Sequence, residues 1–200
     1  MSISAQLVKE LRNKTGIGFM DCKKALMECG ADLEKAVEYL RKKGLSTAAK
    51  KAGRTAGQGL VASYIHGNGK IGVLLEINCE TDFVARTTDF QELTKDISMQ
   101  IAASNPIYIT REEIPSELIE KEMEIVKAQL GDTNKPEKIL EKIIEGKMEK
   151  SFYTKVSLLD QPFIKDDSKS VKSLIMDAIS KLGENIVVSR FVRYALGEQE

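Results

Sequence analysis

The sequence predicts an α+β protein with an N-terminal three-helix domain, a small antiparallel sheet packed with helices, and a helical hairpin. Apolar residues recur every three or four positions through the first 44 residues and again through most of the second half, which is typical of amphipathic helices. Between these regions, two short segments rich in β-branched and leucine side chains flank Gly67-Asn68-Gly69. Asparagine and glycine tolerate positive φ, so this sequence favours a hairpin turn.

Three helices are expected in residues 1–45. The apolar stripe of the first helix is broken at Thr15-Gly16-Ile17-Gly18, and a second helix follows. Asp32 is the expected N-cap of the third helix, and Gly44, after three basic residues, is its expected end. The apolar positions of the three helices are Leu7, Val8, Leu11, Cys22, Ala25, Leu26, Cys29, Leu33, Ala36, Val37 and Leu40. This unit looks like a ubiquitin-associated domain, and a ubiquitin-like partner is one alternative that the likeness leaves open.

Residues 46–58 are expected to form a basic linker rich in glycine, alanine and lysine. The segment has no apolar face, so it is predicted to be a linker or a weakly helical connection. Lys50, Lys51 and Arg54 could contact phosphates, but no aromatic residue is interleaved with them for base stacking. A solvated connection is favoured, and no direct nucleic-acid binding is expected.

Residues 59–200 are predicted to form an α+β core domain. Strands are expected over residues 60–65, 71–77 and 186–194, and a helical hairpin over about 116–151. Its two helices are separated by residues 131–136. The helices of this domain are defined by Phe90, Leu93, Ile97 and Ile101, by Leu118, Ile119, Met123, Val126 and Leu130, by Ile139, Leu140, Ile143, Ile144 and Met148, and by Val171, Leu174, Ile175, Ala178, Ile179 and Leu182.

Composition narrows the class of protein. Two hundred residues with 42% hydrophobic content can bury one core, or a core with a small satellite. No apolar run approaches the ~20 residues that span a bilayer. The N-terminus also lacks a charged-then-apolar signal segment, so a cytoplasmic location without membrane contact is expected. The three cysteines have no CxxC spacing and no nearby histidine, which indicates neither a zinc site nor a disulfide framework.

Charge is divided unevenly along the chain. Residues 1–58 contain 12 Lys and Arg against 6 Asp and Glu, which leaves 18 against 24 of the total 30 and 30 for the rest. The N-terminal part therefore carries +6 and the remainder −6. Such segregation favours different partner surfaces on the two parts.

A bulky apolar residue, Phe83, lies on the connection that follows the second strand. Thr87, Thr88 and Asp89 come shortly after it and can cap a new helix. A phenylalanine on a connection normally folds back onto its own core. The alternative is a side chain that inserts into a partner.

No arrangement for catalysis is recognised in the sequence. There is no Gly-x-x-x-x-Gly-Lys-Ser/Thr loop, so the chain is not expected to bind a nucleotide or another cofactor itself. His66 is the only histidine and lies beside the hairpin turn, where a solvated or turn-bonded role is favoured over a catalytic one. Glu80 and Asp82 could form a carboxylate pair, but no other feature marks a cleft around them. The chain is expected not to be an enzyme.

Two long motifs, in order along the chain, resemble those of the bacterial translation factor family elongation factor Ts, in its short form. The first is Leu7-Val8-Lys9-Glu10-Leu11-Arg12 followed by Thr15-Gly16-Ile17-Gly18-Phe19-Met20-Asp21-Cys22-Lys23-Lys24-Ala25-Leu26. The second is Glu76-Ile77-Asn78-Cys79-Glu80-Thr81-Asp82-Phe83-Val84-Ala85-Arg86. The resemblance covers essentially the whole chain, through to Val192-Arg193-Tyr194-Ala195-Leu196-Gly197-Glu198.

The resemblance implies a guanine-nucleotide exchange factor for the GTPase elongation factor Tu. It implies that Thr81-Asp82-Phe83-Val84 lies against the GTPase and disturbs its magnesium site, so that GDP leaves and GTP can bind. Phe83 would insert, while the other three residues would shape and support the turn. The N-terminal domain would grip the GTPase, with Arg12, Phe19, Met20 and Lys23 as candidates, although packing among the three helices is the alternative for each.

A homodimer is the expected working unit. Longer members of the family carry two related core subdomains, whereas this chain has a single hairpin-and-helix set. A two-fold dimer can supply the missing half, and the strand expected over residues 186–194 is a plausible edge for pairing. No cysteine lies near this strand, so the dimer is expected to be noncovalent.

Overall fold

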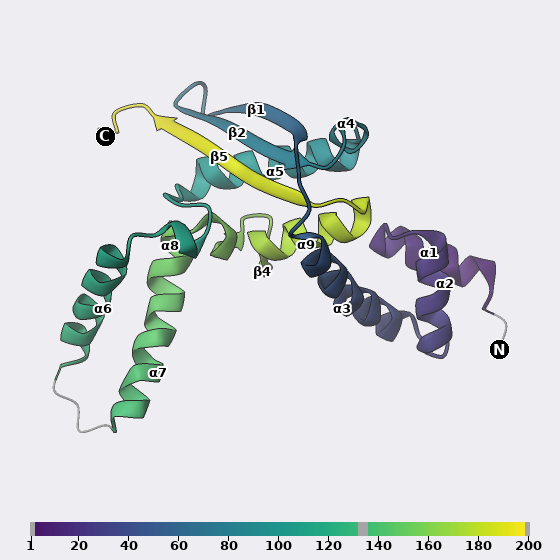
Figure 1. The fold of residues 1–200 in the computed structure, drawn as a ribbon, viewed down its shortest axis with the longest axis horizontal. Helices are drawn as coiled ribbons and strands as arrows, with labels where there is room; N and C mark the ends of the chain where they lie inside the picture. Colours follow the sequence, from purple (N-terminus) through teal and green to yellow (C-terminus); the bar gives the residue numbers. More distant parts are fainter. Residues whose placement is uncertain (1–2, 132–135, 199–200) are drawn as a thin grey trace. The chain divides into compact units, whose positions relative to one another are not determined.

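A computed structural model describes residues 3–131 and 136–198 and confirms the α+β class (Figure 1). The described residues fall into two compact units. The first unit contains Met1–Leu60, Ile77–Leu93 and Ser173–Val187. The second unit contains Val61–Glu76, Thr94–Lys172 and Val188–Glu200.

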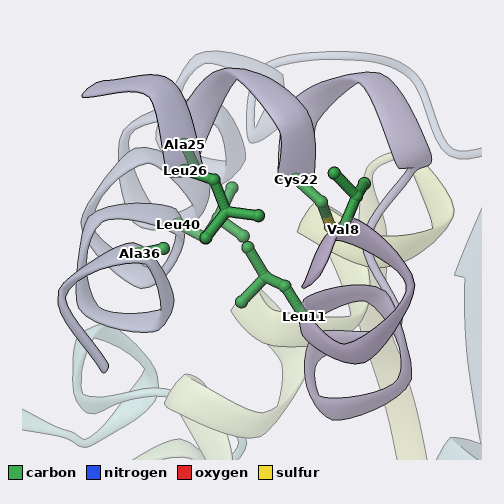
Figure 2. Packing of buried hydrophobic residues seen from close by; sticks show 7 residues of the cluster. All are labelled: Val8, Leu11, Cys22, Ala25, Leu26, Ala36 and Leu40. Atoms are coloured by element: carbon green, nitrogen blue, oxygen red, sulfur yellow. The ribbon is translucent and has the colours of Figure 1, made fainter. Parts of the chain in front are cut away.

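Three N-terminal helices form where the apolar spacing predicts them. They are α1 (Ala5–Thr15), α2 (Phe19–Glu28) and α3 (Leu33–Lys51). Gly16 ends α1 with a φ of 67°, and the Asp32 side chain caps α3 by accepting a hydrogen bond from the Lys35 amide at 3.0 Å. Figure 2 shows the buried side chains between the helices: Val8, Leu11, Cys22, Ala25, Leu26, Ala36 and Leu40.

The prediction that the third helix ends at Gly44 is wrong, because α3 continues to Lys51. Gly44 is buried inside the helix, and a Cβ at this position would lie 3.1 Å from the Ser180 Cβ on α9 (Val171–Leu182). Ala48, one turn further on, is 2% exposed. Small residues therefore form a packing face here, so the predicted linker is helical as far as Lys51. The proposed domain boundaries themselves remain predictions.

The three-stranded sheet has the order β1 (Gln58–His66), β2 (Ile71–Cys79) and β5 (Ile186–Ala195). Its hairpin turn is confirmed, with positive φ at Gly67, Asn68 and Gly69 and a hydrogen bond of 3.1 Å from the Lys70 amide to the His66 carbonyl. Alternate residues of β2 and β5 point into the core. The buried residues on these strands are Val73, Leu75, Ile77, Cys79, Ile186 and Val188.

Helices make up most of the rest of the chain. α4 (Asp82–Ala85) is a single turn, and α5 (Thr88–Ser104) buries the predicted apolar stripe. α6 (Ser116–Leu130) and α7 (Glu137–Lys147) lie side by side as the predicted hairpin (Figure 1), around a small core that includes Val126, Ile144 and Met148. Most of the predicted connection over residues 131–136 lies outside the described residues.

The segment after α7 was not predicted in detail. A π-helix (Met148–Tyr153) continues α7 and leads into α8 (Thr154–Val156), and a two-stranded sheet forms from β3 (Pro162–Phe163) and β4 (Asp166–Ser170). Two 3-10 turns, Arg111–Glu113 and Leu158–Asp160, are the remaining elements of the described residues.

Arg111 joins these short elements in the second unit. Its guanidinium donates to Glu149 at 2.5 and 2.6 Å, pairs with Asp160 at 2.8 Å, and lies 4.4 Å from the centre of the Tyr153 ring. One cation therefore links the turn at Arg111–Glu113 to residues 149–160, which begin 38 positions further along the chain.

Candidate functional site

The candidate site is built on α4, which follows β2 after two residues. Thr81 is its N-cap, with the hydroxyl oxygen accepting a hydrogen bond from the Val84 amide at 3.4 Å. The Thr87 hydroxyl donates to the Val84 carbonyl at 2.7 Å and accepts from the Phe90 amide, so it closes α4 and opens α5. Ala85 is buried at 4% exposure. The turn thus has polar contacts at both ends and a single small residue in the core.

Phe83 points away from the core of its own chain. Its side chain is 77% exposed, whereas Phe90 at the start of α5 is fully buried. Of the two alternatives for Phe83, folding back onto its own core does not fit this exposure. An exposed phenylalanine beside a well-packed core is available to a partner, and its insertion into one stays a prediction.

The two carboxylates beside Phe83 have separate partners. Asp82 pairs with Arg86 on the surface at 2.7 Å. The Glu80 carboxylate accepts a hydrogen bond from the Asn185 backbone amide at 2.7 Å, and it lies 3.6 Å from the Arg54 guanidinium. Each carboxylate is paired with a different arginine, so the arrangement does not match a pair of catalytic carboxylates.

Cys79, at the end of β2, is a structural residue. It is fully buried, and its thiol donates to the Thr81 carbonyl at 3.1 Å. Burial, helped by the negative charge of Glu184, raises the pKa of the thiol. A protonated, buried thiol is not a nucleophile.

The four N-terminal candidates all lie on the surface of the first unit. Arg12 and Lys23 are exposed, and Phe19 and Met20 are 43% and 61% exposed. None belongs to the core of the three helices, and their contact with a partner stays a prediction. Lys23 follows Met20 by three positions and Phe19 by four, which places the three on one face of α2.

His66, Lys51 and Arg54 make hydrogen bonds or ion pairs within their own chain. The His66 ring stacks on Tyr64 and shares a hydrogen bond of 3.0 Å with its hydroxyl. Lys51 donates to the Gly183 carbonyl, and Arg54 pairs with Glu80, so these two cations contact the first unit rather than project freely. Within residues 3–131 and 136–198, no cluster of three metal-ligating side chains is found. Nor does any helix in that part of the chain have the length and apolarity to cross a membrane.

Glu184 and Asn185, just after α9, are the site residues that the sequence did not reveal. Both oxygens of the Glu184 carboxylate accept hydrogen bonds from Thr81, at 2.9 Å from the amide nitrogen and 2.6 Å from the hydroxyl. The backbone amide of Asn185 donates a hydrogen bond to the Glu80 carboxylate. The only local signal is a polar pair after the helix-ending Gly183, and this does not identify a partner about a hundred positions away.

Comparison with known proteins gives a consistent result. The family model described as elongation factor TS matches residues 21–198. The chain is 61% identical to elongation factor Ts of Desulforamulus reducens over 196 residues, covering 98% of this chain and 90% of the relative. It is 61% identical to that of Fervidobacterium nodosum over 198 residues, covering 99% and 100%. It is also 61% identical to that of Anaeromyxobacter sp. (strain Fw109-5) over 196 residues, covering 98% and 89%.

Proposed function

This chain belongs to the elongation factor Ts family of translation elongation factors, and we propose that it is a guanine-nucleotide exchange factor for elongation factor Tu. It acts in the cytoplasm, without covalent chemistry and without a cofactor of its own. The proposal rests mainly on the exposure of the Phe83 side chain. This side chain is 77% exposed, on a helical turn whose two ends are held by hydrogen bonds. Such a side chain is suited to insertion into a partner.

Exchange then follows from linkage between two ligands of the GTPase. If the factor binds best to a form of the GTPase that holds nucleotide poorly, nucleotide must weaken binding of the factor by the same ratio. GDP leaves when the factor binds, and GTP later displaces the factor.

Phe83 acts at the magnesium site of the GTPase in this mechanism. The metal ion bridges phosphate oxygens and neutralises their charge. When the ion is displaced, the exposed charge weakens GDP binding electrostatically. Thr81, Asp82 and Val84 support the turn, as their places in and around α4 allow.

The N-terminal helices supply a second contact. Phe19 and Met20 offer apolar area on one face of α2, beside the cation of Lys23, and Arg12 adds charge on α1. The surplus of +6 in residues 1–58 favours an acidic partner surface. Linking two contacts raises the effective concentration of the second, so both together bind more tightly than either.

The active unit in this proposal is a noncovalent homodimer that does not bind nucleic acid directly. β5 lies at the end of the described sheet order, the position at which a strand of a second copy could be added. It also exposes apolar side chains, with Tyr194 at 65% and Val192 at 38%. Light scattering at micromolar concentration should give twice the 22.2 kDa chain mass. A monomeric mass at high concentration, with full exchange activity, would contradict the dimer.

The decisive experiment measures release of a fluorescent GDP from the cognate elongation factor Tu. At saturating factor, Phe83→Ala should slow release by about thirtyfold, since a central interface residue contributes about 2 kcal/mol. The control is Ile107→Ala, which removes a side chain of similar exposure (64%) from a connection in the second unit.

A magnesium titration separates the proposed mechanism from simple loss of binding. Chelation of Mg²⁺ weakens GDP without help from Phe83, so the parent and Phe83→Ala should then release GDP at similar rates. Release by Phe83→Ala that is as fast as by the parent in the presence of Mg²⁺ would refute the insertion.

A further inference from the structure

We infer that Glu184 is a positioning residue for Phe83: it holds α4 in the orientation that presents the phenyl ring, and it does so without touching the partner. The inference rests on the exchange function proposed above. Glu184 lies on the turn after α9, 103 positions from Thr81. Its two carboxylate oxygens accept separately from the Thr81 amide and hydroxyl, at 2.9 and 2.6 Å. Hydrogen bonds to an ionised group are stronger than neutral ones, and two of them fix a direction as well as a distance.

The direction of these bonds determines how Thr81 caps the helix. A carboxylate can only accept, so the Thr81 hydroxyl must donate its proton to Glu184. The lone pairs of the same hydroxyl are then left to accept from the Val84 amide. Glu184 thus orients the group that starts α4.

α4 cannot hold its own position. It has only four residues, and a helix of one turn does not offset the cost of its nucleation. The pair between Asp82 and Arg86 is exposed, and such surface pairs contribute little. Phe83 itself is mostly exposed, so it adds almost no packing. The remaining contacts are Ala85 in the core, the bond from Thr87 at the end of the turn and, at its start, the weak bond from the Cys79 thiol and the two bonds to Glu184.

Glu184 is itself held by its neighbours. The Asn185 side chain is 2% exposed and donates to the Ala52 and Arg54 carbonyls at 3.4 and 2.8 Å, while its backbone amide donates to Glu80. The Gly183 carbonyl accepts from Lys51. Residues 183–185 therefore contact both the start of α4 and the segment at the end of α3. The carboxylate of Glu184 is fixed relative to the first unit, which lets it position Phe83.

A residue that positions Phe83 should affect the rate of GDP release more than the affinity for the GTPase. Glu184→Gln keeps the size of the side chain but leaves one accepting oxygen where there were two, and it removes the charge. We expect release at saturating factor to slow about tenfold, while the dissociation constant changes less than threefold. The matched control is Asp96→Asn, which removes the same charge from a carboxylate that is 22% exposed and paired with Lys165, in the second unit.

Two further measurements distinguish positioning from general structural damage. Hydrogen exchange of the Thr81 and Val84 amides should accelerate in Glu184→Gln and stay unchanged in Asp96→Asn. The double variant Phe83→Ala/Glu184→Gln should release GDP no more slowly than Phe83→Ala alone, because a residue that acts only through Phe83 has no effect once the ring is gone.

The outcomes separate this inference from the function on which it rests. Parent-like release by Phe83→Ala overturns the exchange mechanism. Slow release by Phe83→Ala together with parent-like release by Glu184→Gln overturns the positioning role alone. Additive losses in the double variant, or equal slowing by Glu184→Gln and Asp96→Asn, also overturn the positioning role.

Discussion

Gly59, at the start of β1, is the position where a single methyl group should do most damage to the framework that leads into the site. Its φ is 144°, which side chains other than glycine rarely adopt. A Cβ there would collide with the carbonyl oxygen of Ile77 and would lie 2.7 Å from the Asn78 Cα. Both obstacles are backbone atoms of β2, so neither can rotate away.

The expected cost of Gly59→Ala can be built from two parts. A non-glycine residue in a sparsely populated backbone region costs about 1–3 kcal/mol. Forcing an extra methyl into a packed region costs a further 1–3 kcal/mol or so. The start of β1 can relieve part of the clash by leaving β2, at the expense of the hydrogen bond from the Asn78 side chain to the Gln58 carbonyl. We therefore expect the free energy of unfolding to fall by about 3 kcal/mol, which lowers the melting temperature by about 6–12 °C in a chain of this length.

The same hairpin supplies the control. Gly72 lies on β2, has no positive φ, and a Cβ there would lie 3.4 Å from the Ile65 side chain, an ordinary contact. Gly72→Ala should leave stability unchanged or raise it by about 0.5 kcal/mol, because it restricts the unfolded chain. Urea denaturation followed by circular dichroism measures both variants. Equal stabilities for Gly59→Ala and Gly72→Ala would refute the steric reasoning.

Two further variants test polar contacts. Asn185→Asp should lower the free energy of unfolding at neutral pH by about 1 kcal/mol more than Asn185→Ala, because it buries a carboxylate against the Ala52 and Arg54 carbonyl oxygens; equal urea midpoints for the two would contradict this. The hydrogen bond from Arg111 lowers the pKa of Glu149 below its ordinary 4.5. Burial acts to raise the pKa of Asp160, but hydrogen bonds from Arg111 and Ser157 outweigh it, and the pKa lies below its ordinary 3.8. A lowered folded-state pKa contributes stability above the ordinary pKa that is lost as pH falls through the folded value. Arg111→Met should therefore be less stable than the parent at pH 7, and the gap should narrow below pH 3.8 in urea titrations; a constant gap would contradict the assignment.

The sequence predicted the fold well wherever apolar periodicity and turn chemistry agreed. The stripe on α5, the Asp32 cap and the Gly67-Asn68-Gly69 turn all lie where local rules place them. The end of α3 was mispredicted because Gly44 satisfies two rules at once. Glycine after basic residues is typical of a helix end, but here the missing Cβ allows close approach to Ser180. The packing of α9 against Gly44, which the sequence does not show, distinguishes a helix end from a close contact.

The candidate site was predictable in part. The motif around Phe83 located the turn, yet no local rule shows whether a phenylalanine on a connection points inward or outward. That depends on which side chains fill the core, and here Phe90 is fully buried whereas Phe83 is exposed. Glu184 could not be found from the sequence, because its bond to Thr81 joins the end of β2 to the turn after α9.

The size of the proposed effect limits how much of the exchange reaction Phe83 can supply alone. Complete burial of a phenylalanine contributes about 1.5–3 kcal/mol, and each 1.4 kcal/mol corresponds to a factor of ten. Phe83 is 77% exposed, so nearly all of this free energy is still available for binding a partner. Insertion of the ring can therefore account for an acceleration of about 10- to 150-fold. Binding of the factor must offset the cost of uncovering the phosphate charge, so any larger acceleration must come from other contacts with the GTPase, such as those of the N-terminal helices.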